Sequence, residues 1–270
     1  MSIKTEAEIK QIKAGGQIMG RILSQLSKMC KPGVTTFEID AAAEKMIVEA
    51  GGRPSFKGYK THKSEPPFPC TICASLNHEL VHGRAKKDVF LKDGDILSID
   101  IGMEWPYHKG EKGYFTDTAI TVPVGKIPEK TKELLRVTRE SLEVGIRAVK
   151  PGNSVADIGK AIENYVKSQG KYGIIRDLVG HGVGYAVHED PRIPNFYDRS
   201  TESWVLKPGM VIAIEPMIAL GHYGISISDD GWTIEMADKS LCAHFEHTVV
   251  ITKNGNEVAT RRPGERNEKF

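Results

Sequence analysis

The residues of this chain best suited to catalytic chemistry are four carboxylates that stand at the ends of apolar, strand-like runs. Asp100 and Glu215 each close such a run, and Asp117 and Glu246 stand near the start of two others. A carboxylate buried in a sheet is costly unless it is protonated, paired or bound to a cation. Singly, each is more typical of a turn or a helix cap than of a metal ligand. Together they cannot all be ionised side by side, so the set predicts a site for divalent cations.

Three histidines could complete such a site. His181 lies in the segment Gly180–Tyr185, which is too glycine-rich for a helix or a packed strand and lets the backbone approach a ligand closely. His188 follows in the same segment, and His82, like His181, precedes a glycine. Carboxylates with one or two imidazoles and no thiolate suit two ions of Mn, Fe(II), Co or Zn rather than a structural zinc site. The glycine spacing does not fit a dinucleotide-binding loop.

The other histidines are predicted to have no part in the site. His247 directly follows Glu246 in a strand pattern, so its side chain should point to the opposite face. The histidines predicted to lie on the surface, among charged or turn-forming residues, are His62, His78, His108, His222 and His244.

The cysteines indicate a reducing compartment. Four cysteines are too few and too scattered to cross-link a chain of this length. Cys70 and Cys73 have C-x-x-C spacing but lack the second pair of a zinc site, which favours two small apolar core residues. The first residues contain no signal-like apolar stretch, so a cytoplasmic location is expected.

An internal duplication indicates which elements position these side chains. The tripeptide Lys-Pro-Gly occurs at 31–33 and at 150–152, and each copy precedes a helical pattern with capping-box spacing, starting at Thr35 and at Ser154. Each of these patterns follows another long helical pattern. The predicted helices span residues 6–29, 35–51, 128–149 and 154–170.

The duplication continues into the strand patterns, where residues 91–100 align with 206–215 and residues 116–122 with 245–251. Matches that recur in the same order predict two α/β halves, about 1–125 and 126–270, fused around a pseudo-twofold axis into a single domain. Equivalent residues should face one another at that axis. The equivalent pairs are Asp100 with Glu215, Asp117 with Glu246, and His82 with His181.

Composition excludes several classes of protein. Of the 270 residues 40% are hydrophobic and 27% charged, as in ordinary globular proteins, and no apolar run is long enough to span a membrane. Lysines and arginines number 37 against 35 acidic residues, so the net charge is only +2. This charge is too small to produce the positive electrostatic potential of a protein that wraps nucleic acid. Neither a nucleic acid nor a membrane is an expected partner.

Jointly, the motifs resemble those of type I methionine aminopeptidases over nearly the whole chain. This resemblance implies the pita-bread fold, an α/β (α+β) architecture of two pseudo-twofold-related halves in which helices cover a curved antiparallel sheet. The segments that carry it are Cys73–Asn77, Val81–Gly83, Ser98–Asp100, Phe115–Thr118, Gly180–Gly184, His188–Pro191, Ile214–Met217, Asp230–Thr233 and Glu246–Thr248.

The resemblance also implies roles for individual residues. His82 would contact the substrate near the scissile amide, His188 would hydrogen-bond the substrate carbonyl or oxyanion, and Glu215 is the candidate proton shuttle. The implied ligands of two metal ions are Asp100, Asp117, His181, Glu215 and Glu246, of which Asp117 and Glu246 would bridge both ions. The residues that match a methionine pocket are Tyr59, Phe68, Cys73 and Trp232.

The implied activity is removal of the N-terminal methionine from nascent proteins and peptides whose second residue is small. A metal-activated water would attack the first peptide bond while Glu215 carries its proton. The expected enzyme is a cytoplasmic monomer that meets nascent polypeptide N-termini in association with the ribosome.

Two segments, 60–67 and 103–112, look longer than in compact members of the family. The sequence leaves two alternatives. Prolidases and aminopeptidase P resemble the same fold and ligand set but carry a further N-terminal domain for which this chain has no residues. A metal-free binding protein on the same scaffold is expected to have lost ligands, whereas all five are present here.

Overall fold

The computed structural model describes residues 2–60 and 66–265. Its helices are α1 (Glu6–Met29), α2 (Thr36–Glu49), α3 (Glu129–Ala148), α4 (Val155–Gln169) and the short 3-10 helix η1 (Arg199–Thr201). Its strands are β1 (Arg53–Pro54), β2 (Ile72–Leu76), β3 (Glu79–Val81), β4 (Ile96–Trp105), β5 (Tyr114–Pro123), β6 (Gly173–Ile174), β7 (Gly180–Gly182), β8 (Glu189–Ile193), β9 (Val211–Ile214), β10 (Met217–Ala219), β11 (Ile225–Ile227), β12 (Ile234–Met236), β13 (Cys242–His244), β14 (Glu246–Thr252) and β15 (Gly255–Val258).

The four predicted helices are confirmed, and capping explains where three of them begin. Thr35 accepts a hydrogen bond from the backbone N–H of Glu38 while the Glu38 carboxylate accepts from the backbone N–H of Thr35. Ser154 has the same reciprocal arrangement at the start of α4, as does Thr5 at the start of α1. These bonds satisfy backbone donors that a helix leaves free in its first turn.

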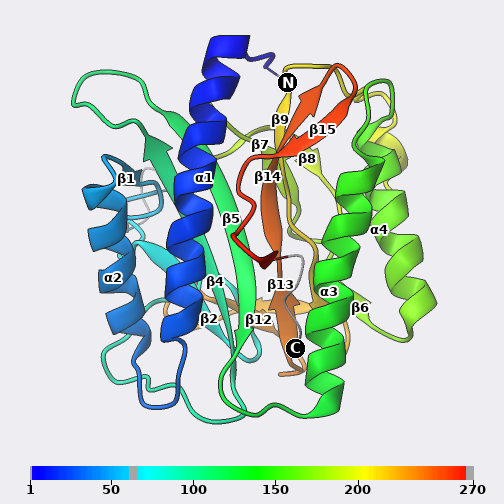
Figure 1. Cartoon of the computed structure of the whole chain (residues 1–270). Coiled ribbons are helices and arrows are strands. Elements are labelled where there is room, and N and C mark those ends of the chain that lie inside the picture. Colours follow the sequence, from blue (N-terminus) through cyan, green and yellow to red (C-terminus); the bar gives the residue numbers. More distant parts are fainter. Residues whose placement is uncertain (1, 61–65, 266–270) are drawn as a thin grey trace.

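The main sheet is symmetric about its centre. Its strand order is β1-β4-β5-β14-β9-β7-β8, with β2 added beside β4 and β15 beside β14. The central neighbours β5 and β14 come from opposite halves of the chain, and β4 and β9 flank them on either side (Figure 1). This arrangement confirms the predicted pair of halves related by a pseudo-twofold axis.

The two halves also match in local hydrogen bonding. An isolated bridge pairs Thr35 with Phe90 in the first half, and its counterpart pairs Ser154 with Val205 in the second. The glycine of each Lys-Pro-Gly tripeptide has a positive φ, 90° at Gly33 and 91° at Gly152. A glycine adopts this left-handed conformation at little cost, so both turns reverse the chain in the same way before a helix.

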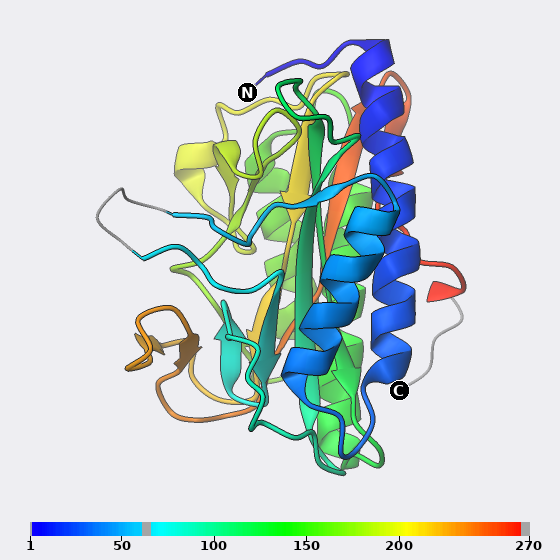
Figure 2. The same ribbon diagram turned by 90° about the vertical axis from the view of Figure 1, so that its left-hand side faces the viewer.

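All four long helices lie on one side of the curved sheet, α1 and α2 over one half and α3 and α4 over the other (Figures 1 and 2). One apolar core joins all four helices to the strands beneath them. No described helix has the length and apolar character needed to cross a membrane. All four cysteines are buried and unbridged, which agrees with the core role predicted for Cys70 and Cys73.

The structure describes one of the two segments that are expected to be longer than in compact members of the family, and only a small part of the other. The segment 103–112 begins inside β4, where Met103 pairs with Thr116 and Trp105 with Tyr114, so it lies in the β-hairpin that joins β4 to β5. Most of the segment 60–67 lies outside the described residues.

Candidate metal centre and substrate pocket

The sheet register brings the predicted carboxylates together at its centre. Ala119 in β5 pairs with Asp100 of β4 on one side and with Glu246 of β14 on the other. Asp117 lies two residues before Ala119, and side chains two apart share a face of a strand. Glu215 directly follows β9, the other neighbour of β14. Carboxylates far apart in the sequence therefore meet at the junction of the two halves.

The donor atoms form three overlapping groups. Ligand atoms of Asp100, Asp117 and Glu246 all lie within 4.8 Å of one another, and so do those of His181, Glu215 and Glu246. The atoms of Asp117, His181 and His188 meet the same condition. Asp117 also faces the second group, because its Oδ2 lies 3.8 Å from Nε2 of His181. The arrangement offers two adjacent cation positions with Glu246 in the first two groups and Asp117 between them.

The hydrogen bonding of these carboxylates fits cations. Oδ1 of Asp100, Oδ1 of Asp117 and Oε1 of Glu246 are buried and have no hydrogen-bond partner in the structure. A buried polar atom without a partner costs free energy that a bound cation would recover. The donor set, all carboxylate and imidazole, is also the one that borderline divalent metals prefer.

Burial and mutual repulsion determine the protonation of the carboxylates in the metal-free site. Burial raises the pKa of Asp100 to about 6, and it raises the pKa values of Asp117 and Glu246 well above their usual range, with neighbouring carboxylates adding to the effect. Burial would also raise the pKa of Glu215, but His244 and His181 outweigh it and the pKa is lowered. Shifts of this kind are typical of functional sites.

His181 presents a nitrogen lone pair to the carboxylates. Its Nδ1 lies 2.9 Å from the carbonyl oxygen of Gly182, which can only accept, so Nδ1 carries the ring hydrogen. In the neutral ring Nε2 then has a lone pair, which faces Oε1 of Glu215 at 3.6 Å. A cation between these two atoms would accept both electron pairs, and an imidazole oriented by a hydrogen bond to a backbone carbonyl is the usual form of a metal ligand.

The segment that carries His181 differs from the sequence prediction. Gly180–Gly182 is a buried strand, β7, between β8 and β9, and not an irregular segment. A Cβ at Gly180 would lie 2.3 Å from the carbonyl oxygen of Ala213, and one at Gly182 would lie 2.5 Å from that of Asp190. The glycines are needed because neighbouring backbones approach too closely for any side chain.

The other two predicted imidazoles also line the cavity. The ring of His188 packs edge-on against that of His181, with centroids 4.5 Å apart, and its Nδ1 lies 3.0 Å from the Tyr59 hydroxyl. Burial and the neighbouring His181 lower the pKa of His188 to about 4, so its ring is neutral at pH 7. Burial likewise lowers the pKa of His82.

A cavity of about 490 Å³ opens over these groups. The four residues predicted for a methionine pocket, Tyr59, Phe68, Cys73 and Trp232, all line it. The rings of Phe68 and Trp232 meet edge-on at 5.3 Å. Apolar wall residues that sequence reasoning missed are Phe56, Val81, Leu178, Val179 and Met217. Nothing in the sequence distinguishes such residues from ordinary core.

One histidine predicted for the surface lies at the site. His244 is 1% exposed and its Nε2 lies 3.4 Å from Oε2 of Glu215. The prediction was wrong because His244 was assigned from its neighbours in the sequence, whereas it is the last residue of β13, a strand packed beside the central sheet. His108 and His222 are exposed and His78 is partly exposed, as predicted, and His62 lies outside the described residues.

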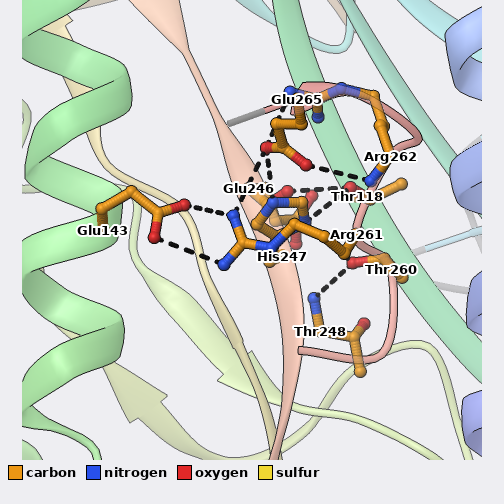
Figure 3. A network of polar contacts seen from close by, with 9 residues as sticks. All are labelled: Thr118, Glu143, Glu246, His247, Thr248, Thr260, Arg261, Arg262 and Glu265. Carbon is orange, nitrogen blue, oxygen red and sulfur yellow. Dashed lines mark hydrogen bonds and ion pairs between the residues drawn. The ribbon is translucent and has the colours of Figure 1, made fainter. Parts of the chain in front are cut away.

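His247 points away from the carboxylates, as predicted, and enters a polar network behind β14 (Figure 3). Its Nε2 donates to Glu265 at 2.8 Å and its Nδ1 lies 3.0 Å from the Thr260 hydroxyl. Glu143, His247 and Glu265 are close enough to form a separate, fourth group of donors. Arg261 already pairs with Glu143 and Arg262 with Glu265, so guanidinium groups supply the positive charge that these two carboxylates need.

Comparison with known proteins agrees with this geometry. The model of metallopeptidase family M24 matches residues 10–253. Methionine aminopeptidase 1 of Bacillus subtilis is 44% identical over 258 residues, which cover 96% of this chain and 98% of that protein. The structure resembles that of methionine aminopeptidase from Thermotoga maritima, with a TM-score of 0.89 at 40% identity, covering 97% of this chain and 100% of that one.

A prolidase from Pyrococcus horikoshii is also similar, with a TM-score of 0.74 at 26% identity. The match covers 96% of this chain but only 63% of the prolidase chain. The methionine aminopeptidases match over nearly their full length and at higher identity. The chain therefore belongs to metallopeptidase family M24 and, within it, to the methionine aminopeptidases.

Proposed function

We propose that this protein removes the N-terminal methionine from polypeptides whose second residue is small, using two divalent ions held at the junction of its halves. The observation that carries the proposal is the convergence of five donor side chains, three of them with unpartnered buried oxygens, on the wall of an apolar cavity. Membership of a metallopeptidase family accounts for the use of divalent metal.

The five donors would be shared between the two ions. Asp100 belongs to one group, His181 and Glu215 belong to the other, and Asp117 and Glu246 would contact both ions. When bound, the ions would supply Lewis acidity and an activated water as the nucleophile, and their identity would be Mn, Fe(II), Co or Zn.

The protein's own groups would position the substrate and move protons. Glu215, whose pKa is lowered in spite of burial, is ionised at pH 7 and would accept a proton and pass it to the leaving amine. With the Tyr59 hydroxyl donating to Nδ1 of His188, the ring hydrogen would reside on Nε2 and could be donated to the substrate carbonyl oxygen. His82 would contact the scissile amide from the same cavity wall.

The shape of the cavity supports specificity for methionine. Phe68, Cys73 and Trp232 would surround the thioether side chain, which suits soft and aromatic neighbours. The second residue would then lie toward the mouth of the cavity, where bulk would be rejected by overlap. Such a rim discriminates more steeply than the roughly 1–3 kcal/mol that one methylene contributes in an apolar pocket.

The setting of the reaction is part of the same proposal. All of residues 1–270 would form one catalytic domain, since the main core and the main sheet each include elements of both halves. It would act as a monomer in the cytoplasm on nascent N-termini, in association with ribosomes. Light scattering would measure the oligomeric state, and co-sedimentation would measure the association with ribosomes.

Hydrolysis of short peptides tests the activity. Met-Ala-Ser should be cleaved in the presence of Mn²⁺, Co²⁺ or Fe²⁺ and not in the presence of a chelator. In a Met-Xaa-Ser series, kcat/KM should be high for Gly, Ala, Ser, Thr, Cys, Pro or Val at the second position and very low for Lys, Leu, Phe or Glu. Cleavage of Ala-Pro without cleavage of Met-Ala-Ser would instead assign the prolidase activity.

A further inference from the structure

His244 is a buried imidazole with no established task in the metal centre. It is 1% exposed, and neither of its ring nitrogens makes a well-formed hydrogen bond in the structure. Its Nε2 lies 3.4 Å from Oε2 of Glu215. A buried polar side chain normally has a partner, so the orientation of this ring toward a single carboxylate oxygen calls for an explanation.

The backbone holds both side chains at this distance. The Thr121 hydroxyl accepts from the backbone N–H of His244 at 2.8 Å and donates to its carbonyl oxygen at 2.9 Å. The side-chain amide of Asn195 donates to the carbonyl oxygen of Glu215 at 3.0 Å. His244 also pairs with Met217, two residues beyond Glu215. The close approach of ring and carboxylate is therefore imposed by neighbouring strands.

Glu215 lies between two imidazoles that differ in what they can donate. His181 uses the hydrogen on Nδ1 for the carbonyl oxygen of Gly182, so its Nε2 offers a lone pair to Oε1 of Glu215. His244 has no acceptor at Nδ1 and is free to carry its hydrogen on Nε2. Oε1 of Glu215 thus faces the lone pair of His181, and Oε2 faces a ring nitrogen of His244 that can donate a hydrogen bond.

We propose that His244 is a positioning residue that donates from Nε2 to Oε2 of Glu215 and so turns Oε1 toward His181 and the cation between them. This inference rests on the proposed function of the same site. His244 is absent from the donor groups and from the lining of the cavity, so it acts through Glu215 and contacts neither cation nor substrate. Partners that orient a metal ligand in this way affect metal affinity by about 10- to 100-fold.

Two substitutions separate the hydrogen bond from the packing. His244→Leu fills similar space without a donor, and His244→Gln retains an N–H that reaches a similar distance. The matched control is His78→Leu, because His78 also faces a glutamate, Glu235, at 3.4 Å but is partly exposed and away from the cavity. Should His244→Leu fail to fold by circular dichroism, His244→Met is the more adaptable replacement.

The measurement is metal retention, with Mn²⁺-loaded protein equilibrated against a series of chelator concentrations. His244→Leu should weaken the apparent affinity of one ion by about 10- to 100-fold, while His244→Gln stays within about threefold of the wild type and His78→Leu is unchanged. Under saturating Mn²⁺ the KM for Met-Ala-Ser should be unaltered, because the residue does not touch the peptide.

Two results would overturn the inference. Wild-type Mn²⁺ affinity in His244→Leu would show that the hydrogen bond has no effect on the metal. Equal losses of Mn²⁺ affinity in the Leu and Gln variants would show that His244 acts through packing and not through its hydrogen bond. A wild-type protein that binds Mn²⁺ and cleaves Met-Ala-Ser leaves the proposed function intact in either case. A wild-type protein that does neither would refute both.

Discussion

Asp117 and Thr248 are joined by two hydrogen bonds across the junction of the halves. The backbone N–H of Asp117 donates to the Thr248 hydroxyl at 2.9 Å, and that hydroxyl donates to the carbonyl oxygen of Asp117 at 2.8 Å. The ladder between β5 and β14 runs from Glu246 with Ala119 to His247 with Thr118. Beyond this ladder the Thr248 side chain takes the place of a neighbouring strand backbone, and it fixes the backbone of Asp117, one of the proposed metal ligands.

Thr248→Val removes that pair of bonds and leaves the backbone N–H and C=O of Asp117 without partners. The expected cost is about 1–3 kcal/mol in the free energy of unfolding, together with weaker metal retention because Asp117 is displaced. Thr138→Val is the matched control, since it removes a buried hydroxyl that bonds only within α3, to the carbonyl oxygen of Leu134. Urea unfolding and chelator competition measure both effects, and equal metal retention in the two variants would contradict the account.

Asp117→Asn tests whether one carboxylate serves two ions. Because Asp117 lies between both donor groups, its loss should abolish activity and lower the metal content below that of the wild type. Metal analysis after gel filtration, combined with hydrolysis of Met-Ala-Ser, checks this. Full activity with wild-type metal content would show that Asp117 bridges nothing.

His188→Ala tests whether this histidine acts on the substrate or on the metal. The variant should keep its metal and lose about 10²–10³ in kcat, the usual cost of one oxyanion donor. Tyr59→Phe should lower kcat in the same direction by a smaller factor, because it removes the hydroxyl that orients the ring. The exposed His222→Ala is the control. Loss of metal in His188→Ala would place this imidazole among the ligands.

Much of the fold could be predicted because the chain contains it twice. The capping residues Thr35 and Ser154 and the repeated Lys-Pro-Gly turns located two helices, and the duplicated strand patterns indicated that Asp117 and Glu246 face one another. A repeat is informative because fusion around a twofold axis brings both copies of a residue to one place. The order of the strands follows from the same symmetry.

The remaining errors have a common physical cause. His244 and strand β7 were misjudged from local composition, although both are determined by contacts between distant segments. The short distance from Gly180 to Ala213 and that from His244 to Glu215 exist only after the sheet forms. Apolar wall residues such as Leu178 and Met217 gave no signal, because a pocket wall and a core have the same composition.

The network behind β14 should make stability depend on pH. Glu265 is 4% exposed; its burial would raise its pKa, but His247 and two arginines more than offset this, so the pKa of Glu265 is lowered. A carboxyl whose pKa is lower in the folded state stabilises the fold above its unfolded pKa of about 4.3, and this contribution is lost as the pH falls further.

Glu265→Gln should therefore cost about 3 kcal/mol in the free energy of unfolding at pH 7, with the difference from wild type shrinking below about pH 4. Urea unfolding between pH 7 and pH 3 measures it. Glu257→Gln is the control, because the Glu257 side chain is half exposed in its pair with Lys13 and should cost less than about 1 kcal/mol. A difference that stays constant with pH would show that the charge of Glu265 is not what stabilises the network.

Anomalous diffraction from crystals grown with Mn²⁺ would show whether carboxylates from both halves hold two cations between them. We expect two adjacent anomalous peaks, one among Asp100, Asp117 and Glu246 and one among Asp117, His181, Glu215 and Glu246. No peak at the junction of β5 and β14, or a peak only among Glu143, His247 and Glu265 on the opposite face, would contradict this expectation.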